Sequence, residues 1–325
     1  MVKVELHCHL DGAIPPKLFL QLSKELNLVD TDDQTWLNSH IIHENMPLVE
    51  CLKYFDLLIS LLQTKEHLSM VTEGIIDMKY KEGVRLLELR FAPQEHNKLS
   101  MEEATLAVLD GLNKGKAKHP DMVVGIIVAM MNNDAMDLND KTIDIAYKYK
   151  DKGIVGIDLA GNEGYNKIDA FDSLLEKAHN LGLNITLHAG ESQGPEFVKK
   201  AIDNHANRIG HGIHAIYDQK VVDELIDKKI LLEISPTSNI FSNCVSSFDE
   251  HPVRSFFDQG VPINISTDDP LLLDLDIDHE YDILRNKFNF TEKELMQINL
   301  YSAKASFCKD KDMIIKQIEE EIKRA

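Results

Sequence analysis

The chain has 325 residues, of which 43% are hydrophobic and 27% are charged, a composition typical of a globular protein with ample material for a core. Lysine and arginine number 35 against 54 aspartate and glutamate residues, so the formal net charge is -19. An acidic surface repels phosphate polyanions, which argues against nucleic acid or an anionic membrane as a partner.

Cysteine usage and the N-terminus indicate the cellular compartment. The four cysteines are widely spaced and form no CxxC pair, which favours a reducing environment over a disulfide framework or a thiolate zinc site. The N-terminus lacks an apolar signal region, and no run approaches the roughly 18 apolar residues that a membrane-spanning helix needs. We therefore expect a cytoplasmic protein with no membrane partner.

Short apolar runs rich in β-branched residues recur along the chain, each bounded by turn residues, as strands are. The eight predicted strands are 2–8, 84–91, 123–130, 154–160, 184–189, 207–210, 229–235 and 261–267. Stretches with helical periodicity lie between them and include 67–82, 101–118, 138–151 and 169–181. Gly83, Gly153 and Gly182 follow three of these helices, where glycine commonly ends a helix.

Eight strands that alternate with helices predict an α/β fold, a parallel (β/α)8 TIM barrel that forms one domain over residues 1–325. Two stretches exceed the simple repeat. A helical insertion over 13–66 follows the first strand, and C-terminal helices begin near 279, where Thr291 and Glu294 form a capping-box pattern. The rival doubly wound sheet is disfavoured because no GxGxxG or GxxxxGK[ST] string follows any strand.

Polar residues recur at the C-terminal ends of the predicted strands, where a barrel of this kind places its active site. These residues are His7, His9, Asp158, Gly161, His188, Glu191, His211, Asp268 and Asp269. Because residues i and i+2 of a strand point to the same face, His7 and His9 both face the barrel interior. With His188 and Asp268 they form a nitrogen and oxygen ligand set suited to zinc, which lowers the pKa of bound water to about 7.

Structural explanations of the same residues remain open at this point. A single histidine is usually a surface residue or a hydrogen-bonded core residue. Glu191 is also suited to capping the helix that would begin near Gly194 and Pro195. Asp268 and Asp269 are suited to capping the next helix, in which case one carboxylate still points inward.

The strings ELHCHLDGAI, GIDLAGNE, TLHAGE, RIGHG, SPTSN and STDDP, in this order, resemble those of the zinc-dependent adenosine deaminases, a family of amidohydrolases. The resemblance covers residues 4 to 275 approximately. It implies hydrolytic deamination of adenosine and 2′-deoxyadenosine to inosine or deoxyinosine and ammonia in purine salvage. It also implies one Zn²⁺ ion per chain.

The resemblance assigns a role to each residue that would take part in the chemistry. The implied zinc ligands are His7, His9, His188 and Asp268. His211 resembles the base that takes the proton of the attacking water and steers the hydroxide, and Glu191 resembles the acid that protonates purine N1. For Glu191 to donate a proton at neutral pH its pKa has to be raised, which burial in a dry site would achieve.

The remaining implied contacts bind the nucleoside. Asp269 would complete the catalytic set by contacting purine N7, the backbone N–H of Gly161 would contact N3, and Asp11 would face the ribose 5′-hydroxyl. In the insertion, Leu48, Leu52 and Phe55 lie at helical spacing and resemble the family's hydrophobic gate. Cys51 stands where a bulkier apolar residue is common, and a plain amphipathic helix packed on the barrel is the alternative explanation.

Three other functions stay open. Close relatives deaminate adenine or N6-modified adenosine monophosphate, although HLDG and RFAPQ at 90–94 look more like the nucleoside branch. No cluster of arginine or lysine near the motifs indicates a phosphate site. A two-metal phosphoesterase or amidohydrolase often uses a bridging lysine after strand four, where this chain has DLAGNEG. A noncatalytic ligand-binding barrel would not require this set of proton-transferring residues.

Overall fold

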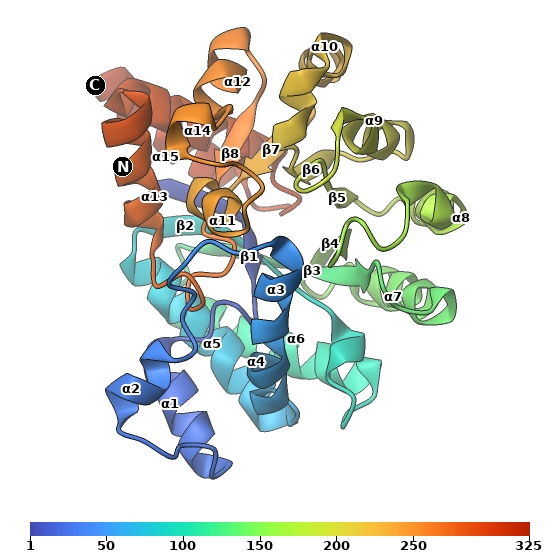
Figure 1. Cartoon of the computed structure of the whole chain (residues 1–325), viewed down its shortest axis with the longest axis vertical. Helices are drawn as coiled ribbons and strands as arrows, with labels where there is room; N and C mark the ends of the chain where they lie inside the picture. The colour runs from blue at the N-terminus through green and yellow to red at the C-terminus, as the bar shows by residue number, and fades with distance from the viewer.

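The computed structural model describes residues 1–325 and forms a barrel of eight parallel strands surrounded by helices (Figure 1). The strands are β1 (Lys3–His9), β2 (Val84–Phe91), β3 (Val123–Met131), β4 (Ile154–Ala160), β5 (Thr186–Ala189), β6 (Arg208–His211), β7 (Leu231–Ile234) and β8 (Ile263–Ile265). Parallel pairing runs in order from β1 to β4 and from β5 to β8. Parallel bridges between Ile157 and Ile185 and between Cys8 and Asp268 join the two sheets on both sides, so the predicted TIM barrel is confirmed.

Three strands of the second half, β5, β7 and β8, are shorter than predicted, whereas β6 has the predicted length. The run 261–267 yields only the three residues of β8, and Asp268, which follows the run, has a left-handed backbone with φ 62°. His211, at the end of β6, has φ 59°. Non-glycine residues seldom adopt this region, and an extended strand cannot continue through it. Two predicted site residues therefore lie at left-handed turns, His211 as the last residue of β6 and Asp268 shortly after β8.

The barrel closes through backbone bonds beside the predicted ligands. The N–H of His9 donates to the carbonyl of Asp268 at 2.9 Å, and the N–H of Asp268 donates to the carbonyl of His7 at 3.1 Å. The register between β1 and β2 shifts between Glu5 and Cys8, an irregularity that re-aims side chains near active sites. The first strand thus meets the last one at the level of the site.

Helices cover the outside of the barrel, and the predicted helical segments are confirmed within a few residues. These helices are α5 (Lys65–Lys81), α6 (Met101–Lys118), α7 (Met136–Tyr149), α8 (Asp172–Asn180), α9 (Pro195–Asp203), α10 (Gln219–Lys228), α11 (Pro236–Phe241) and α12 (Val253–Gln259). A core of 72 buried apolar residues combines strand side chains such as Leu87 with helix side chains such as Val108. None of the helices combines the length and the apolar character needed to cross a bilayer.

The C-terminal helices are α13 (Ile277–Phe288), α14 (Glu292–Ala305) and α15 (Asp312–Arg324). The capping box of Thr291 and Glu294 is present at the start of α14, as predicted. Short 3-10 turns are η1 (Leu52–Tyr54), η2 (Pro93–Glu95), η3 (Ile168–Phe171), η4 (Ile213–Tyr217) and η5 (Phe248–Glu250).

The insertion after β1 forms α1 (Pro16–Glu25), α2 (Asp33–Asn38), α3 (Leu48–Cys51) and α4 (Phe55–Leu61). Figure 1 shows α3 and α4 lying across the front of the barrel. The single helical face predicted for Leu48, Leu52 and Phe55 is divided, because η1 tightens the chain between α3 and α4. All three side chains nevertheless line one cavity.

The barrel interior carries charged side chains where such barrels usually pack branched apolar residues. Arg208 contacts Glu233 and Glu88, each at 2.6 Å, and Arg90 contacts Glu233 at 2.6 Å. All four side chains are fully buried or nearly so. Removing one partner of a buried ion pair leaves an uncompensated charge, so this network fixes how the strands lie around the site.

Candidate active site

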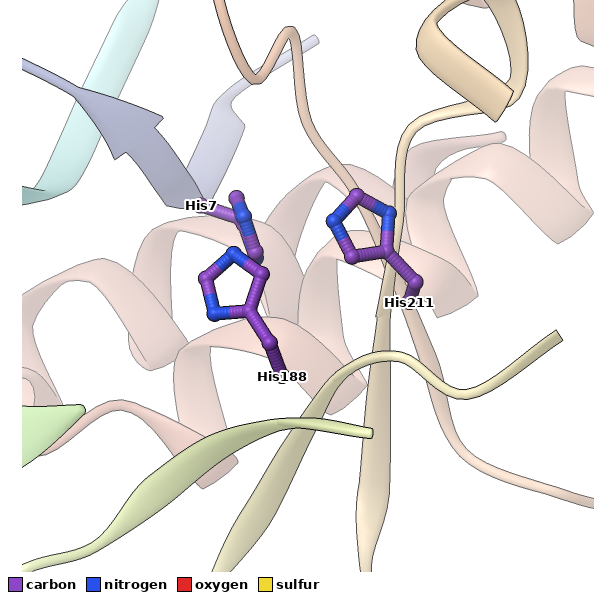
Figure 2. A group of neighbouring side chains, drawn as sticks. All are labelled: His7, His188 and His211. Carbon is purple, nitrogen blue, oxygen red and sulfur yellow. The ribbon is translucent and has the colours of Figure 1, made fainter. Parts of the chain in front are cut away.

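Three histidine rings from three different strands converge on one small space. Figure 2 shows His7 from β1, His188 from β5 and His211 from β6 with their rings facing one another. The ring centroid of His7 lies 4.6 Å from that of His188 and 4.8 Å from that of His211. The sequence separates these residues widely, and the barrel brings them together at the ends of its strands.

The nitrogen and oxygen atoms around His7 are arranged as a metal would require. Its Nε2 atom lies 3.2 Å from Oδ1 of Asp268, and Nε2 of His9 lies 3.4 Å from the same oxygen. Both His7 Nε2 and Asp268 Oδ1 are buried without a hydrogen-bond partner. Buried polar atoms are rarely left unpaired, so two lone-pair donors in contact fit a site for a divalent cation.

The other ring nitrogens of two predicted ligands are held by carboxylates. Nδ1 of His7 donates to Glu233 at 2.9 Å, and Nδ1 of His188 donates to Asp158 at 3.0 Å. Arg90 contacts Asp158 as well as Glu233. Burial alone would raise the pKa of Asp158, but the charges of His188 and Arg90 hold it below its ordinary value. These contacts leave both Nε2 atoms free for a metal, as metal-binding histidines require.

The loop between β5 and α9 carries Glu191 and is held by the carboxylate of Glu163. The backbone N–H groups of Glu191, Ser192 and Gln193 donate to Glu163 Oε2 at 3.2, 2.9 and 3.0 Å. The N–H of Gly190 donates to the other oxygen. The alternative explanation of Glu191 as a helix cap is wrong, because Gly194 is the residue that precedes α9.

Glu191 lies buried beside His211. The Oε2 atom of Glu191 is 3.8 Å from Nε2 of His211, and both side chains are almost entirely shielded from solvent. Burial, reinforced by the negative charge of Asp268, raises the pKa of Glu191 to about 8. At neutral pH this carboxyl group therefore carries a proton that it can donate.

A cavity of about 470 Å³ opens above the convergent side chains, a volume suited to a small molecule. Every predicted site residue except His7 and Asp158 lines it: His9, Asp11, Leu48, Leu52, Phe55, Gly161, His188, Glu191, His211, Asp268 and Asp269. His7 lies beneath, fully buried. Phe55 approaches the ring of His9 with centroids 6.4 Å apart, so the helical insertion forms one wall of the same cavity.

Gly12, in the turn that follows β1, allows the side chain of Asp269 to approach this turn closely. A Cβ atom added at Gly12 would lie 1.9 Å from Asp269 Oδ1, so only glycine fits. Asp269 Oδ1 is buried without a partner. Burial, followed by the charge of Asp268, raises the pKa of Asp269 well above its ordinary value. A protonated Asp269 can therefore donate a hydrogen bond into the cavity.

Several residues that shape the site were not identified from the sequence. Glu163 stands in the string GIDLAGNE, and Arg90 and Glu233 are charged residues inside apolar strands, a signal that was available. Asn239 likewise stands in the string SPTSN, whereas His251 had no signal of this kind. Nδ2 of Asn239 lies 3.0 Å from Nδ1 of His211, and its Oδ1 lies 3.2 Å from Nε2 of His251.

Comparisons with known proteins agree across the whole chain. A family model described as adenosine deaminase matches residues 2–324. A protein named adenosine deaminase from Haemophilus ducreyi is 36% identical over 318 residues, covering 95% of this chain and 92% of that protein.

Solved structures show the same architecture. An N6-mAMP deaminase from Arabidopsis superposes with a TM-score of 0.87 at 26% identity, covering 100% of this chain and 98% of that one. An adenine deaminase from Arthrobacter aurescens superposes with a TM-score of 0.90 at 24% identity, covering 99% of each chain. The similarity to the adenine deaminase supports the shared fold alone.

Proposed function

The chain belongs to the adenosine deaminase family, and from this premise we propose that it hydrolyses adenosine and 2′-deoxyadenosine to inosine or deoxyinosine and ammonia. The observation that carries the proposal is the burial of Glu191 at 3.8 Å from His211 and beside the His7 cluster, where burial raises its pKa to about 8 and so favours the protonated form at neutral pH. An acid in this position suits protonation of a purine ring. We propose that residues 1–325 act as one hydrolase domain.

The proposed metal is one Zn²⁺ ion per chain, held by His7, His9, His188 and Asp268. Three imidazoles and one carboxylate form a ligand set typical of zinc, and the unpartnered atoms of His7 and Asp268 support it. When bound, zinc lowers the pKa of a coordinated water to about 7 and supplies hydroxide at neutral pH.

The protein side chains supply the proton chemistry. Glu191 protonates N1 of the purine, which draws electron density from C6 and makes that carbon a better electrophile. His211 faces the same space and steers the attacking oxygen toward C6. After the oxygen has bonded to C6, its remaining proton passes to the amino group, the bond between C6 and that nitrogen breaks, and ammonia leaves. The oxygen stays as the 6-oxo group, and the first proton of the water replaces the one that Glu191 gave to N1.

Three contacts would orient the nucleoside in the cavity. The protonated carboxyl of Asp269 would donate to N7, which is an acceptor, and its raised pKa supports this role. The backbone N–H of Gly161 would contact N3. Asp11 would accept a hydrogen bond from the ribose 5′-hydroxyl, with Leu48, Leu52 and Phe55 as the apolar gate.

The acidic lining of the cavity favours a nucleoside over a nucleotide. Asp11, Asp56 and Glu95 all line it, and none of them forms an ion pair with a lysine, arginine or histidine. Burial, followed by neighbouring carboxylates, raises the pKa of Glu95 to about 7. The lysine of the lining, Lys53, is paired with Glu50 at 2.6 Å. A phosphate would therefore meet carboxylates without a compensating cation.

The test compares adenosine, 2′-deoxyadenosine, adenine, adenosine monophosphate and its N6-methyl derivative in parallel with zinc-loaded protein. Ammonia release and the ultraviolet change of the purine are measured, with Glu191→Gln as the inactive control. We expect the two nucleosides to react fastest. Preference for adenine or for a nucleotide would move the protein to another branch, and two tightly bound metals per chain would favour a binuclear amidohydrolase.

A further inference from the structure

A chain of hydrogen bonds runs from the start of α12 to the ring of His211. The backbone N–H of Val253 donates to Nδ1 of His251 at 3.2 Å. Nε2 of His251 lies 3.2 Å from Oδ1 of Asn239, and Nδ2 of Asn239 lies 3.0 Å from Nδ1 of His211. His251, Asn239 and His211 are 5%, 0% and 1% exposed, so water does not compete for these bonds.

The direction of every bond in this chain follows from its first member. A backbone N–H can only donate, and Val253 is the first residue of α12, where the N–H has no acceptor within the helix. Nδ1 of His251 must therefore offer a lone pair. Burial lowers the pKa of His251 to about 3, so the ring is neutral and carries its one proton on Nε2.

The directions of the next two hydrogen bonds follow from the side-chain amide of Asn239. Because Nε2–H of His251 donates, the group of Asn239 that faces it is the oxygen, and the NH₂ group faces His211. Nδ1 of His211 then accepts. A neutral imidazole that accepts at Nδ1 has its proton on Nε2. That nitrogen faces the site, 3.8 Å from Glu191 Oε2 and 3.9 Å from Asp268 Oδ2.

We propose that His251 and Asn239 are positioning residues that hold His211 in the tautomer with its proton on Nε2. On the proposed function, His211 then meets the attacking oxygen as a hydrogen-bond donor that orients its lone pair toward C6. The role of a base, which the resemblance implies for His211, requires the opposite tautomer, with a lone pair on Nε2. The contacts of Asn239 and His251 thus decide whether Nε2 of His211 first acts as a hydrogen-bond donor or as a base.

Two variants disturb this chain of hydrogen bonds in different ways. In Asn239→Asp the carboxylate can only accept, so it would accept a hydrogen bond from Nδ1–H of His211, which holds the ring proton on Nδ1 and leaves a lone pair on Nε2. His251→Phe removes the hydrogen bond from Nε2–H of His251 to Asn239 without adding a buried charge. The side-chain amide of Asn239 can then turn and present either its oxygen or its NH₂ group to His211. His96→Phe is the matched control, because His96 is equally buried and bonds only to the carbonyl of Leu62.

The direct measurement is the tautomer of His211 in zinc-loaded protein with ¹⁵N-labelled histidine, from two-bond proton–nitrogen NMR correlations. The His211 signals are assigned by their loss in His211→Asn. We expect protonated Nε2 in the unaltered protein and in His96→Phe, protonated Nδ1 in Asn239→Asp, and a mixture in His251→Phe. A lone pair on Nε2 of His211 in the unaltered protein would overturn the proposal, whether or not any variant folds.

Kinetics on adenosine provide the second measurement. Contacts of this kind behind a reactive group are worth about 10- to 100-fold in activity, so kcat of Asn239→Asp should fall by that factor while KM changes little. Unchanged kcat in a folded Asn239→Asp with an altered tautomer would also reject the proposal. The tautomer is read without turnover, so a protein that fails to deaminate adenosine would refute the proposed function and leave this inference to the NMR result.

Discussion

The carboxylate of Glu163, which follows β4, accepts the backbone N–H of Glu191 at 3.2 Å and so anchors the loop that carries the proposed acid. In Glu163→Gln an NH₂ group would replace one oxygen and face N–H donors. We expect kcat to fall by up to about 100-fold through misplacement of Glu191, with normal metal content. Glu196→Gln, an exposed carboxylate at the start of α9, is the control that should keep full activity. Equal activity of both variants would show that Glu163 does not position the loop.

Glu191 itself is tested by Glu191→Gln, which keeps the shape of the side chain and removes the proton. Loss of a general acid typically lowers kcat by about 10²- to 10⁴-fold. Zinc content, measured by atomic absorption, should stay at one per chain because Glu191 is not a proposed ligand. Substantial residual activity would remove Glu191 from the mechanism.

The pKa of Glu191, raised to about 8 by burial and then by Asp268, predicts a basic limit to activity. The protonated carboxyl is the active form, and it is populated below this pKa and lost above it. We expect kcat/KM for adenosine to be level near neutrality and to fall about tenfold per pH unit well above pH 8. The base of adenosine does not titrate in this range. A kcat/KM that rises from neutral to basic pH is incompatible with an acid role.

Phe55 tests the apolar gate. Phe55→Ala removes a ring that faces His9 across the cavity, and the lost apolar burial should raise KM for adenosine about tenfold. The zinc content should not change, because the ring is not a ligand. An unchanged KM would show that α3 and α4 only pack against the barrel.

Metal removal should destabilise the fold. Without a cation, His7 Nε2 and Asp268 Oδ1 are two buried lone-pair donors only 3.2 Å apart, an arrangement that destabilises the native state. A metal ion that binds only the native state would stabilise it. We expect a chelator to lower Tm by several degrees and added Zn²⁺ to restore it, as measured by calorimetry. His7→Ala should show little response to either treatment. Identical melting of the chelated and zinc-loaded protein would contradict a structural contribution of the metal.

The barrel and the convergence of its strand ends were predictable because both follow from local patterns. Apolar runs of strand length marked β1 to β8, and the polar residues at their ends marked His7, His188 and Asp268. The lengths of β5, β7 and β8 were overestimated, because apolar residues continue beyond the part of each run that pairs with a neighbouring strand. The left-handed turns at His211 and Asp268 also leave no mark in hydrophobicity. Helical spacing likewise predicted one face for the gate and missed the 3-10 turn η1 within it.

Contacts between distant residues lay beyond sequence reasoning. Arg90 and Glu233 are 143 positions apart, and no spacing rule relates them. The pair of Asn239 and His251 spans a loop and a turn whose path only the folded chain defines. Such residues contact, directly or through one another, the side chains that would bind substrate or metal, and they do not enter the site themselves. Their role can therefore be recognised only when the folded structure shows which side chains they contact.

The backbone hydrogen bonds between β1 and Asp268 have a consequence for the order of events during synthesis and folding. His7 and His9 are synthesised long before Asp268, yet the backbone partner that closes the barrel beside them, and the carboxylate that lies against their Nε2 atoms, both belong to Asp268. A nascent chain therefore cannot complete the proposed metal site before Asp268 has been synthesised. Metal uptake should accordingly follow the closure of the barrel, and a chain that stalls before Asp268 should lack the metal.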